Sequence, residues 1–204
     1  MTLARRFAAQ LAQPRGLAGR WLGRAMDIAN ARATRRAVDL LQPLDGEVIL
    51  DAGCGTGAAL AEVRRRARCA VFGVDRSEAM IAAASRRLGC AAKLEVGSLE
   101  AEWPATARAD GVLLLNVLYF AGPDAAMVRA LHDRLRPGGR LVVYVTHRAT
   151  MKQWRFARSG LHRLFDAGEL AQVLVDGGFA RARVKVHEEP VGGLARGLFG
   201  IAQR

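Results

Sequence analysis

Three glycines alternate with other residues directly after an acidic side chain, at Asp51, Gly53, Gly55 and Gly57, and the three residues before them are apolar. Such a segment predicts a buried strand that runs through a tight turn into a helix. Glycine lets the backbone approach a ligand closely, and the N–H groups at the start of a helix attract an anionic group. The sequence therefore predicts a binding loop for a small-molecule cofactor.

The same loop fits the G-x-G-x-x-G/A fingerprint of dinucleotide-binding proteins through Gly53, Gly55 and Ala58. Asp51 distinguishes the two kinds of ligand, because a carboxylate at the end of the strand would repel a pyrophosphate but attract an ammonium and a sulfonium group. S-adenosylmethionine carries both of these cations. We favour this cofactor, and a dinucleotide-dependent oxidoreductase is the alternative.

The composition is that of a folded domain with a large excess of positive charge. Of the 204 residues, 51% are hydrophobic and 25% are charged, with a formal charge of +12. This length supports one large core, and no apolar run approaches the roughly 20 residues that span a membrane. Three cysteines without a C-x-x-C pair, and no histidines at ligand spacing, predict a reduced, cytoplasmic and metal-free protein.

The positive charge raises the question of an acidic partner such as nucleic acid. All but three of the 31 cationic residues are arginine, which indicates a coding bias, and this disfavours nucleic acid as the partner. Residues 1–44 hold eight of these arginines against two aspartates. We interpret 1–44 as a basic helical lid or extension, with a solvated face or a transit peptide as alternatives, and 45–204 as the cofactor-binding domain.

Hydrophobic periodicity predicts alternating strands and helices. Helices are expected over 1–13, 21–41, 58–66, 77–87, 124–135 and 166–176, and strands over 48–51, 70–74, 92–96, 111–115, 141–145, 180–187 and 194–203. Continuous apolar strands indicate a mostly parallel sheet with helices on both faces. The fold class is therefore α/β, a Rossmann-like doubly wound sheet of seven strands that ends in a C-terminal antiparallel hairpin.

In a sheet of this kind the ligand lies at the carboxyl ends of the strands, where the strand order reverses. Asp75 ends the second strand, where a carboxylate can accept the hydroxyl protons of a ribose, or can simply begin the next helix. Arg76 and Met80 would border the adenine. Ser98 after the third strand would bond the adenine edge or face solvent, and Asn116 ends the fourth strand.

Four blocks in this order resemble the class I S-adenosylmethionine-dependent methyltransferases of the small-molecule, type 11-like group. The blocks are Ile49–Gly57, Val74–Met80, 109–118 and 135–141. Residues 13–19 with Met26 and Asn30 also look like the lid helix of some of these enzymes. Ser98 stands where many relatives have Asp, so adenine recognition is expected to use the backbone N–H of Leu99.

The resemblance implies methyl transfer to a small organic acceptor by in-line displacement, with an RNA- or other macromolecule-directed methyltransferase as the alternative. It implies cofactor contacts from these residues: Asp51, Gly53, Cys54, Gly55, Gly57, Asp75, Arg76, Met80, Ser98, Leu99 and Asn116.

Three side chains near the strand ends are candidate general bases: His147, Tyr119 and His162. A packed or surface role is the alternative for each. His147 is preferred because it directly follows the fifth strand. An aromatic and apolar insertion after that strand suits an apolar or aromatic acceptor, although core packing explains it equally well. Its members are Trp154, Phe156, Leu161 and Phe165.

Overall fold

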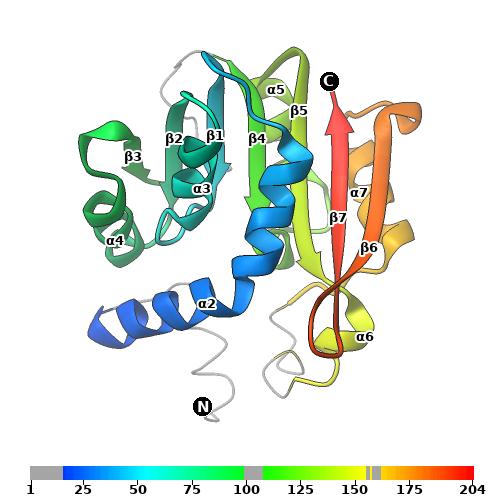
Figure 1. The fold of residues 1–204 in the computed structure, drawn as a ribbon. Helices are drawn as coiled ribbons and strands as arrows, with labels where there is room; N and C mark the ends of the chain where they lie inside the picture. The colour runs from blue at the N-terminus through cyan, green and yellow to red at the C-terminus, as the bar shows by residue number, and fades with distance from the viewer. Residues whose placement is uncertain (1–15, 99–107, 155–156, 158–161) are drawn as a thin grey trace.

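The structure is a computed structural model that describes residues 16–98, 108–154, 157 and 162–204, with side chains described from residue 25 onwards (Figure 1). The predicted helix over 1–13 lies outside the described residues.

Helices and strands alternate along the described chain. The helices are α2 (Gly16–Leu41), α3 (Ala58–Arg66), α4 (Glu78–Leu88), α5 (Ala126–Arg134), α6 (Arg148–Met151) and α7 (Ala167–Asp176). The strands are β1 (Val48–Ala52), β2 (Ala70–Asp75), β3 (Lys93–Val96), β4 (Ala109–Leu115), β5 (Leu135–Thr146), β6 (Val184–Gly192) and β7 (Ala195–Gln203). Short 3₁₀ helices cover Gly89–Ala91, Leu118–Phe120 and Arg181–Arg183.

The seven strands form one sheet in the order β3-β2-β1-β4-β5-β7-β6. The first five strands in this order pair in parallel, and β7 pairs antiparallel with β5 and with β6. The order therefore reverses between β1 and β4. These observations confirm the predicted fold class, including the antiparallel hairpin at the C-terminus.

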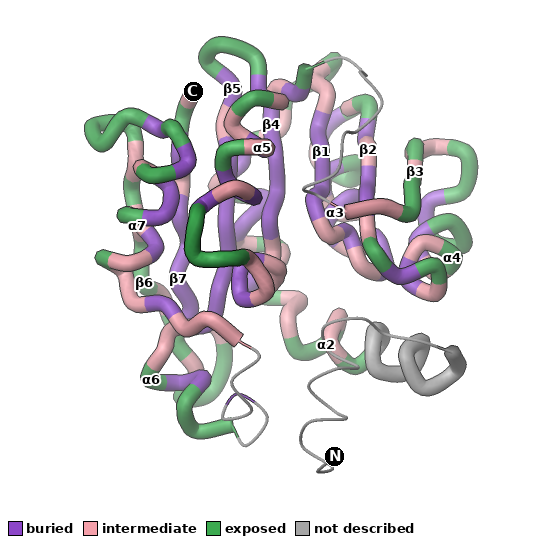
Figure 2. Tube along the Cα trace, turned by 180° about the vertical axis from the view of Figure 1, so that it is seen from behind, coloured by how far each residue is buried: buried purple, intermediate pink, exposed green. Residues whose placement is uncertain are grey.

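Side chains that alternate along the strands belong to two hydrophobic cores, one on each face of the sheet. Ile49 points to the core beneath α2 and α3, whereas its neighbour Leu50 belongs to the core beneath α5 and α7. Both faces of the central strands are therefore covered, which explains why their sequences are continuously apolar. The edge strand β3 is mostly exposed, as its green colour in Figure 2 shows.

The sequence predicts the starts of α3, α4 and α7 to within one residue. Helix α3 has the predicted limits, and α4 begins one residue after the predicted start, at Glu78, because the Ser77 side chain accepts the Met80 N–H as an N-cap. Asp166 and Glu169 form a capping box at the start of α7, since each side chain accepts the backbone N–H of the other residue. Side-chain caps thus fix the starts of α4 and α7, whereas α3 begins after Gly57 without a side-chain cap.

Several predicted boundaries are wrong, including the starts of α2, β5 and β6 and the end of β6, which runs to Gly192 rather than to 187. Helix α2 begins at Gly16 rather than at 21, because the low helix propensity of a single glycine is not enough to end a helix. Strand β5 begins at Leu135 rather than at 141, because Leu135 pairs with Ala109 before a register shift. Strand β6 begins at Val184 rather than at 180, because Arg181–Arg183 form a 3₁₀ turn.

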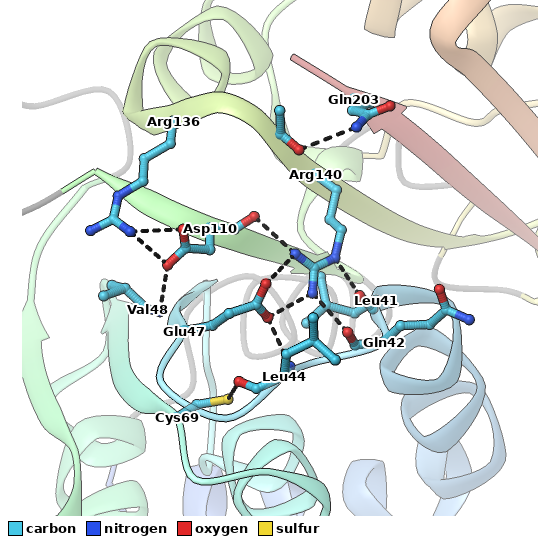
Figure 3. A network of polar contacts seen from close by, with 11 residues as sticks. Leu41, Gln42, Leu44, Glu47, Val48, Cys69, Asp110, Arg136, Arg140 and Gln203 are labelled. Carbon is cyan, nitrogen blue, oxygen red and sulfur yellow. Dashed lines mark hydrogen bonds and ion pairs between the residues drawn. The ribbon is translucent and has the colours of Figure 1, made fainter.

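The Arg140 side chain fastens the C-terminal end of α2 to the amino-terminal edge of the sheet (Figure 3). It donates hydrogen bonds to both carboxylate oxygens of Glu47, at 2.8 and 2.7 Å, and to the backbone carbonyls of Leu41, Gln42 and Asp110. Burial alone would raise the pKa of Glu47, but the bonds from Arg140 and from the Leu44 N–H lower it overall. This edge is opposite the carboxyl ends of the strands.

We predict that Arg140→Met lowers the free energy of unfolding by about 2 kcal/mol, because it removes the charged partner of a half-buried carboxylate and the donor to three carbonyls. Thermal unfolding should show a midpoint lower by roughly 5 °C. Arg136→Met is the matched control, since Arg136 is more exposed and pairs with Asp110 alone. An equal loss in both variants would contradict the prediction.

Candidate functional site

The glycine loop joins β1 to α3 and is hydrogen-bonded to the end of β2. The N–H groups of Gly53 and Cys54 both donate to the Val74 carbonyl at 2.8 Å. Gly53, Gly55 and Gly57 have φ values of 86°, 52° and 76°, a region that suits glycine. A Cβ at Gly57 would also lie 2.9 Å from the Leu88 side chain, so close packing on α4 requires this glycine.

The Asp75 carboxylate connects the glycine loop to the start of α4. One oxygen accepts the Gly55 N–H at 2.9 Å and the other accepts the Ser77 N–H at 2.8 Å. Burial raises the pKa of Asp75, and these two backbone bonds oppose that rise. Because each carboxylate oxygen has two lone pairs, both can still accept a ligand hydroxyl.

Asp51 lies deeper than Asp75 and is only 2% exposed. Burial, with a smaller contribution from the charge of Asp75, raises the pKa of Asp51 to about 7. No described residue hydrogen-bonds or forms an ion pair with its carboxylate. A buried carboxylate without a partner is unfavourable unless a ligand supplies a donor or a positive charge.

These residues line one pocket at the carboxyl ends of the strands, at the point between β1 and β4 where the strand order reverses. Of the residues expected to bind the cofactor, the pocket is lined by Asp51, Gly53, Cys54, Gly55, Asp75, Arg76, Met80 and Asn116. Gly57 lies behind the loop against α4. The structure therefore brings together eight of the eleven expected contacts.

Two residues, Ser98 and Leu99, are expected at the adenine edge, and neither is among the described residues that line the pocket. Ser98 does not line the pocket, and its hydroxyl accepts a hydrogen bond from Arg76 at 3.0 Å; the neighbouring Gly97 lines the pocket instead. Leu99 lies outside the described residues. A role for either in adenine recognition stays a prediction.

Asn116 adopts a left-handed conformation, with φ at 60°, at the end of β4. Its backbone N–H donates to the Tyr144 carbonyl at 2.9 Å, and its side-chain oxygen accepts the Tyr119 hydroxyl at 3.3 Å. Asparagine tolerates this conformation better than most residues, and such strain is common at functional sites. Tyr119 thus helps to hold Asn116 at the pocket wall.

None of the three candidate bases lines the pocket. The Tyr119 hydroxyl is occupied by the Thr146 N–H and by Asn116, and burial raises its pKa. His147 caps α6, where its Nδ1 accepts the Ala149 N–H at 3.1 Å. His162 packs its ring against Phe120, 5.2 Å between centroids, and burial lowers its pKa.

The apolar insertion after β5 does not form the pocket wall in its described part. Phe165 is fully buried in the core beneath α5 and α7, and Trp154 is 38% exposed. Phe156 and Leu161 lie outside the described residues. The core-packing alternative therefore holds for Phe165.

Helix α2 supplies a wall of the pocket that the sequence only partly indicated. Figure 1 shows it passing below the ends of the parallel strands. Its pocket residues are Met26, Asp27, Asn30 and Thr34, whose spacing places them on one helix face. Met26 and Asn30 were indicated by the resemblance to a lid helix, whereas Asp27 and Thr34 were not. Val117, Phe120 and Met127 add apolar lining that no motif indicated.

The described residues contain no group of three or more His, Cys, Asp or Glu side chains that could hold a metal ion. No helix in the described part of the chain is both long and apolar enough to cross a membrane.

The fold and the pocket define an α/β protein that binds its ligand at the point where strand order reverses. A family model described as a methyltransferase domain matches residues 49–139. The ubiquinone biosynthesis O-methyltransferase of Pseudomonas paraeruginosa is 30% identical over 162 residues, which cover 74% of this chain and 68% of that protein. The chain therefore belongs to the class I S-adenosylmethionine-dependent methyltransferase family.

Other known proteins agree with this family and differ in what their names say they act on. The protein-L-isoaspartate O-methyltransferase of Methylorubrum populi is 30% identical over 145 residues, and the chain spans 65% of its length, less than two thirds. The solved structure of a 1,6-didemethyltoxoflavin-N1-methyltransferase from Burkholderia thailandensis has a TM-score of 0.69 at 23% identity. That match covers 100% of this chain and 91% of the other, and it shows the same fold.

We predict that Asp51→Asn raises the thermal midpoint by roughly 5 °C or more at pH 8 and leaves it unchanged at pH 4. Because the folded pKa of Asp51 is raised to about 7, the unfolded chain ionises first. The wild-type protein therefore loses stability as the pH rises from about 4 to 7, and the amide removes this loss.

Thermal scans across this pH range measure the effect. The control is Asp45→Asn, because hydrogen bonds from the backbone and side chain of Arg68 lower the pKa of Asp45. Asp45→Asn should not stabilise the protein at pH 8. An Asp51→Asn midpoint that follows the wild-type value at every pH would contradict the prediction.

Proposed function

We propose that this protein is an S-adenosylmethionine-dependent methyltransferase that transfers a methyl group to a small organic acceptor. Family membership supports the cofactor and the class of reaction. The observation that carries the proposal is the buried Asp51 carboxylate, which lines the pocket without a partner among the described residues.

The pocket residues fit the charges of this cofactor. Asp51 offers its carboxylate to a cationic group, and Asp75 offers two acceptor oxygens to ribose hydroxyls at the outer end of the pocket. Met80 is 3% exposed and supplies an apolar surface beside Asp75 for a planar base. The open space at Gly55, where a Cβ would meet nothing within 4 Å, leaves room for the ligand.

When bound, S-adenosylmethionine would supply an electrophilic methyl group, whose carbon the acceptor nucleophile would attack in line while S-adenosylhomocysteine leaves as the neutral thioether. The contribution of the protein is to orient the two reactants, and good geometry of this kind provides on the order of 7–11 kcal/mol. Asn116 is suited to this task, because Tyr119 and the backbone of β5 fix its position at the end of β4.

The remaining pocket wall is apolar and supports an apolar or aromatic acceptor. It consists of Leu115, Val117, Phe120, Met127 and Met26. The polar side chains of Asn30 and Thr34 face the same space from α2 and would orient the polar group of the acceptor. Macromolecular acceptors are disfavoured because α2 lies across this side of the site.

None of the chain's four histidines lines the pocket, and the Tyr119 hydroxyl is already hydrogen-bonded. We therefore favour an acceptor whose nucleophile needs no strong base. Tyr119 acts as a positioning residue for Asn116. His147 remains the preferred base if the acceptor must lose a proton.

We further propose that residues 1–44 are a lid or extension and that residues 45–204 form the cofactor-binding domain. The α2 residues of the pocket wall support this division. The three cysteines, Cys54, Cys69 and Cys90, are all free, which supports a reducing compartment such as the cytoplasm.

We predict that isothermal calorimetry detects binding of S-adenosylmethionine and of its demethylated product. Asp75→Ala should weaken both by more than about tenfold, because it removes the acceptor for the ligand and for the Gly55 N–H. Glu95→Ala, an exposed change on the neighbouring strand β3, is the control. Binding of reduced nicotinamide cofactor in place of S-adenosylmethionine would support the oxidoreductase alternative instead.

The acceptor class is tested by incubating the protein and S-adenosylmethionine with metabolite extracts from the host. Mass spectrometry should show an apolar or aromatic small molecule that gains one methyl group in a cofactor-dependent manner. Methylation confined to RNA or protein in the same extracts would contradict a small acceptor.

A further inference from the structure

A cluster of three polar side chains joins α2 to the glycine loop and to α4. The Thr56 hydroxyl donates to the Asp27 carboxylate at 2.7 Å. Arg87 donates to the Thr56 oxygen at 2.7 Å and to Asp27 at 2.6 Å. We call these three residues the clasp.

The clasp reaches the cofactor pocket from two sides. Asp27 lines the pocket, and Thr56 lies between Gly55 and Gly57 in the glycine loop. Thr56 is only 6% exposed, so its hydroxyl depends on Asp27 and Arg87 for its hydrogen bonds. A change in the clasp therefore acts on the pocket and on the loop at once.

Apolar packing does not hold this part of α2 in place. Residues 25–32 are all half-buried or exposed, and Ile28 is 80% exposed. The first buried side chain of the described helix is Ala33, which with Ala37 and Leu41 packs against α3 and β1. The C-terminal part of α2 is thus fixed by the core, whereas no side chain of residues 25–32 belongs to either core.

We propose that the clasp holds residues 25–32 of α2 over the bound cofactor and sets the rate at which the cofactor leaves. Asp27, Thr56 and Arg87 are positioning residues in this proposal. It rests on the proposed function, since it takes the pocket to be the S-adenosylmethionine site. Partly exposed ion pairs contribute little net stability, so the clasp can open without unfolding the domain.

Arg87 also balances charge at the pocket. It neutralises Asp27, so that Asp51 and Asp75 are the pocket carboxylates to which no cationic side chain of the described residues is bonded. Asp27→Asn and Arg87→Met change the charge of the pocket in opposite directions. If both variants change the cofactor dissociation rate in the same direction, the cause is therefore the loss of the clasp rather than a change in the electrostatic potential of the pocket.

The test measures dissociation of tritiated S-adenosylmethionine after rapid dilution with excess unlabelled cofactor. Asp27→Asn and Arg87→Met should each increase the dissociation rate by about threefold to tenfold. The double variant should be no faster than the faster single variant, because both substitutions break the same interaction. Arg86→Met is the matched control, since Arg86 is on the same helix and forms no hydrogen bond or ion pair with the described residues.

Hydrogen exchange of the ligand-free variants provides a second readout. Backbone amides of 25–32 should exchange faster in Asp27→Asn and Arg87→Met than in the wild type, with the thermal midpoint within about 2 °C. Unchanged dissociation rates, opposite effects of the two variants, or strictly additive effects would overturn the proposal. If the wild-type protein does not bind S-adenosylmethionine, the proposed function fails, and the clasp proposal fails with it.

Discussion

The site depends on two hydrogen bonds that the Asp75 carboxylate accepts. This carboxylate binds the N–H of Gly55 and the N–H of Ser77 with separate oxygens, and so connects two segments that leave neighbouring strands. The first bond fixes the direction of the glycine loop, and the second fixes the first turn of α4. The ligand pocket, the loop and the helix that carries Arg87 therefore behave as one unit.

The buried Asp51 carboxylate lowers the stability of the ligand-free protein and would thereby increase its affinity for a cationic ligand. Its pKa is raised because burial penalises the charged form, and nothing described in the protein compensates the charge. A ligand cation would remove that penalty, so part of the free energy of binding is stored as an unfavourable contact in the ligand-free fold. A residue optimised for folding alone would be uncharged here.

The sequence predicts what local chemistry determines. The limits of α3, the start of α4 and the gathering of Asp51, Asp75 and Asn116 at one edge follow from periodicity and the rule for parallel sheets. The contact of Asp27 with Arg87, sixty positions along the chain, has no local signal because it depends on how α2 lies across the sheet. The early start of β5 was missed for the same reason, since it depends on pairing with Ala109.

The environment of Cys54 has a consequence for the chemistry of an electrophilic cofactor. Its thiol belongs to the pocket wall but is packed against Gly73, where burial followed by the charges of Asp51 and Asp75 raises its pKa. A thiolate is a strong nucleophile and a thiol is a weak one. Burial, together with the carboxylates that would attract a sulfonium, thus keeps this thiol of the pocket wall in its protonated form, which is the weaker nucleophile toward an electrophilic methyl group.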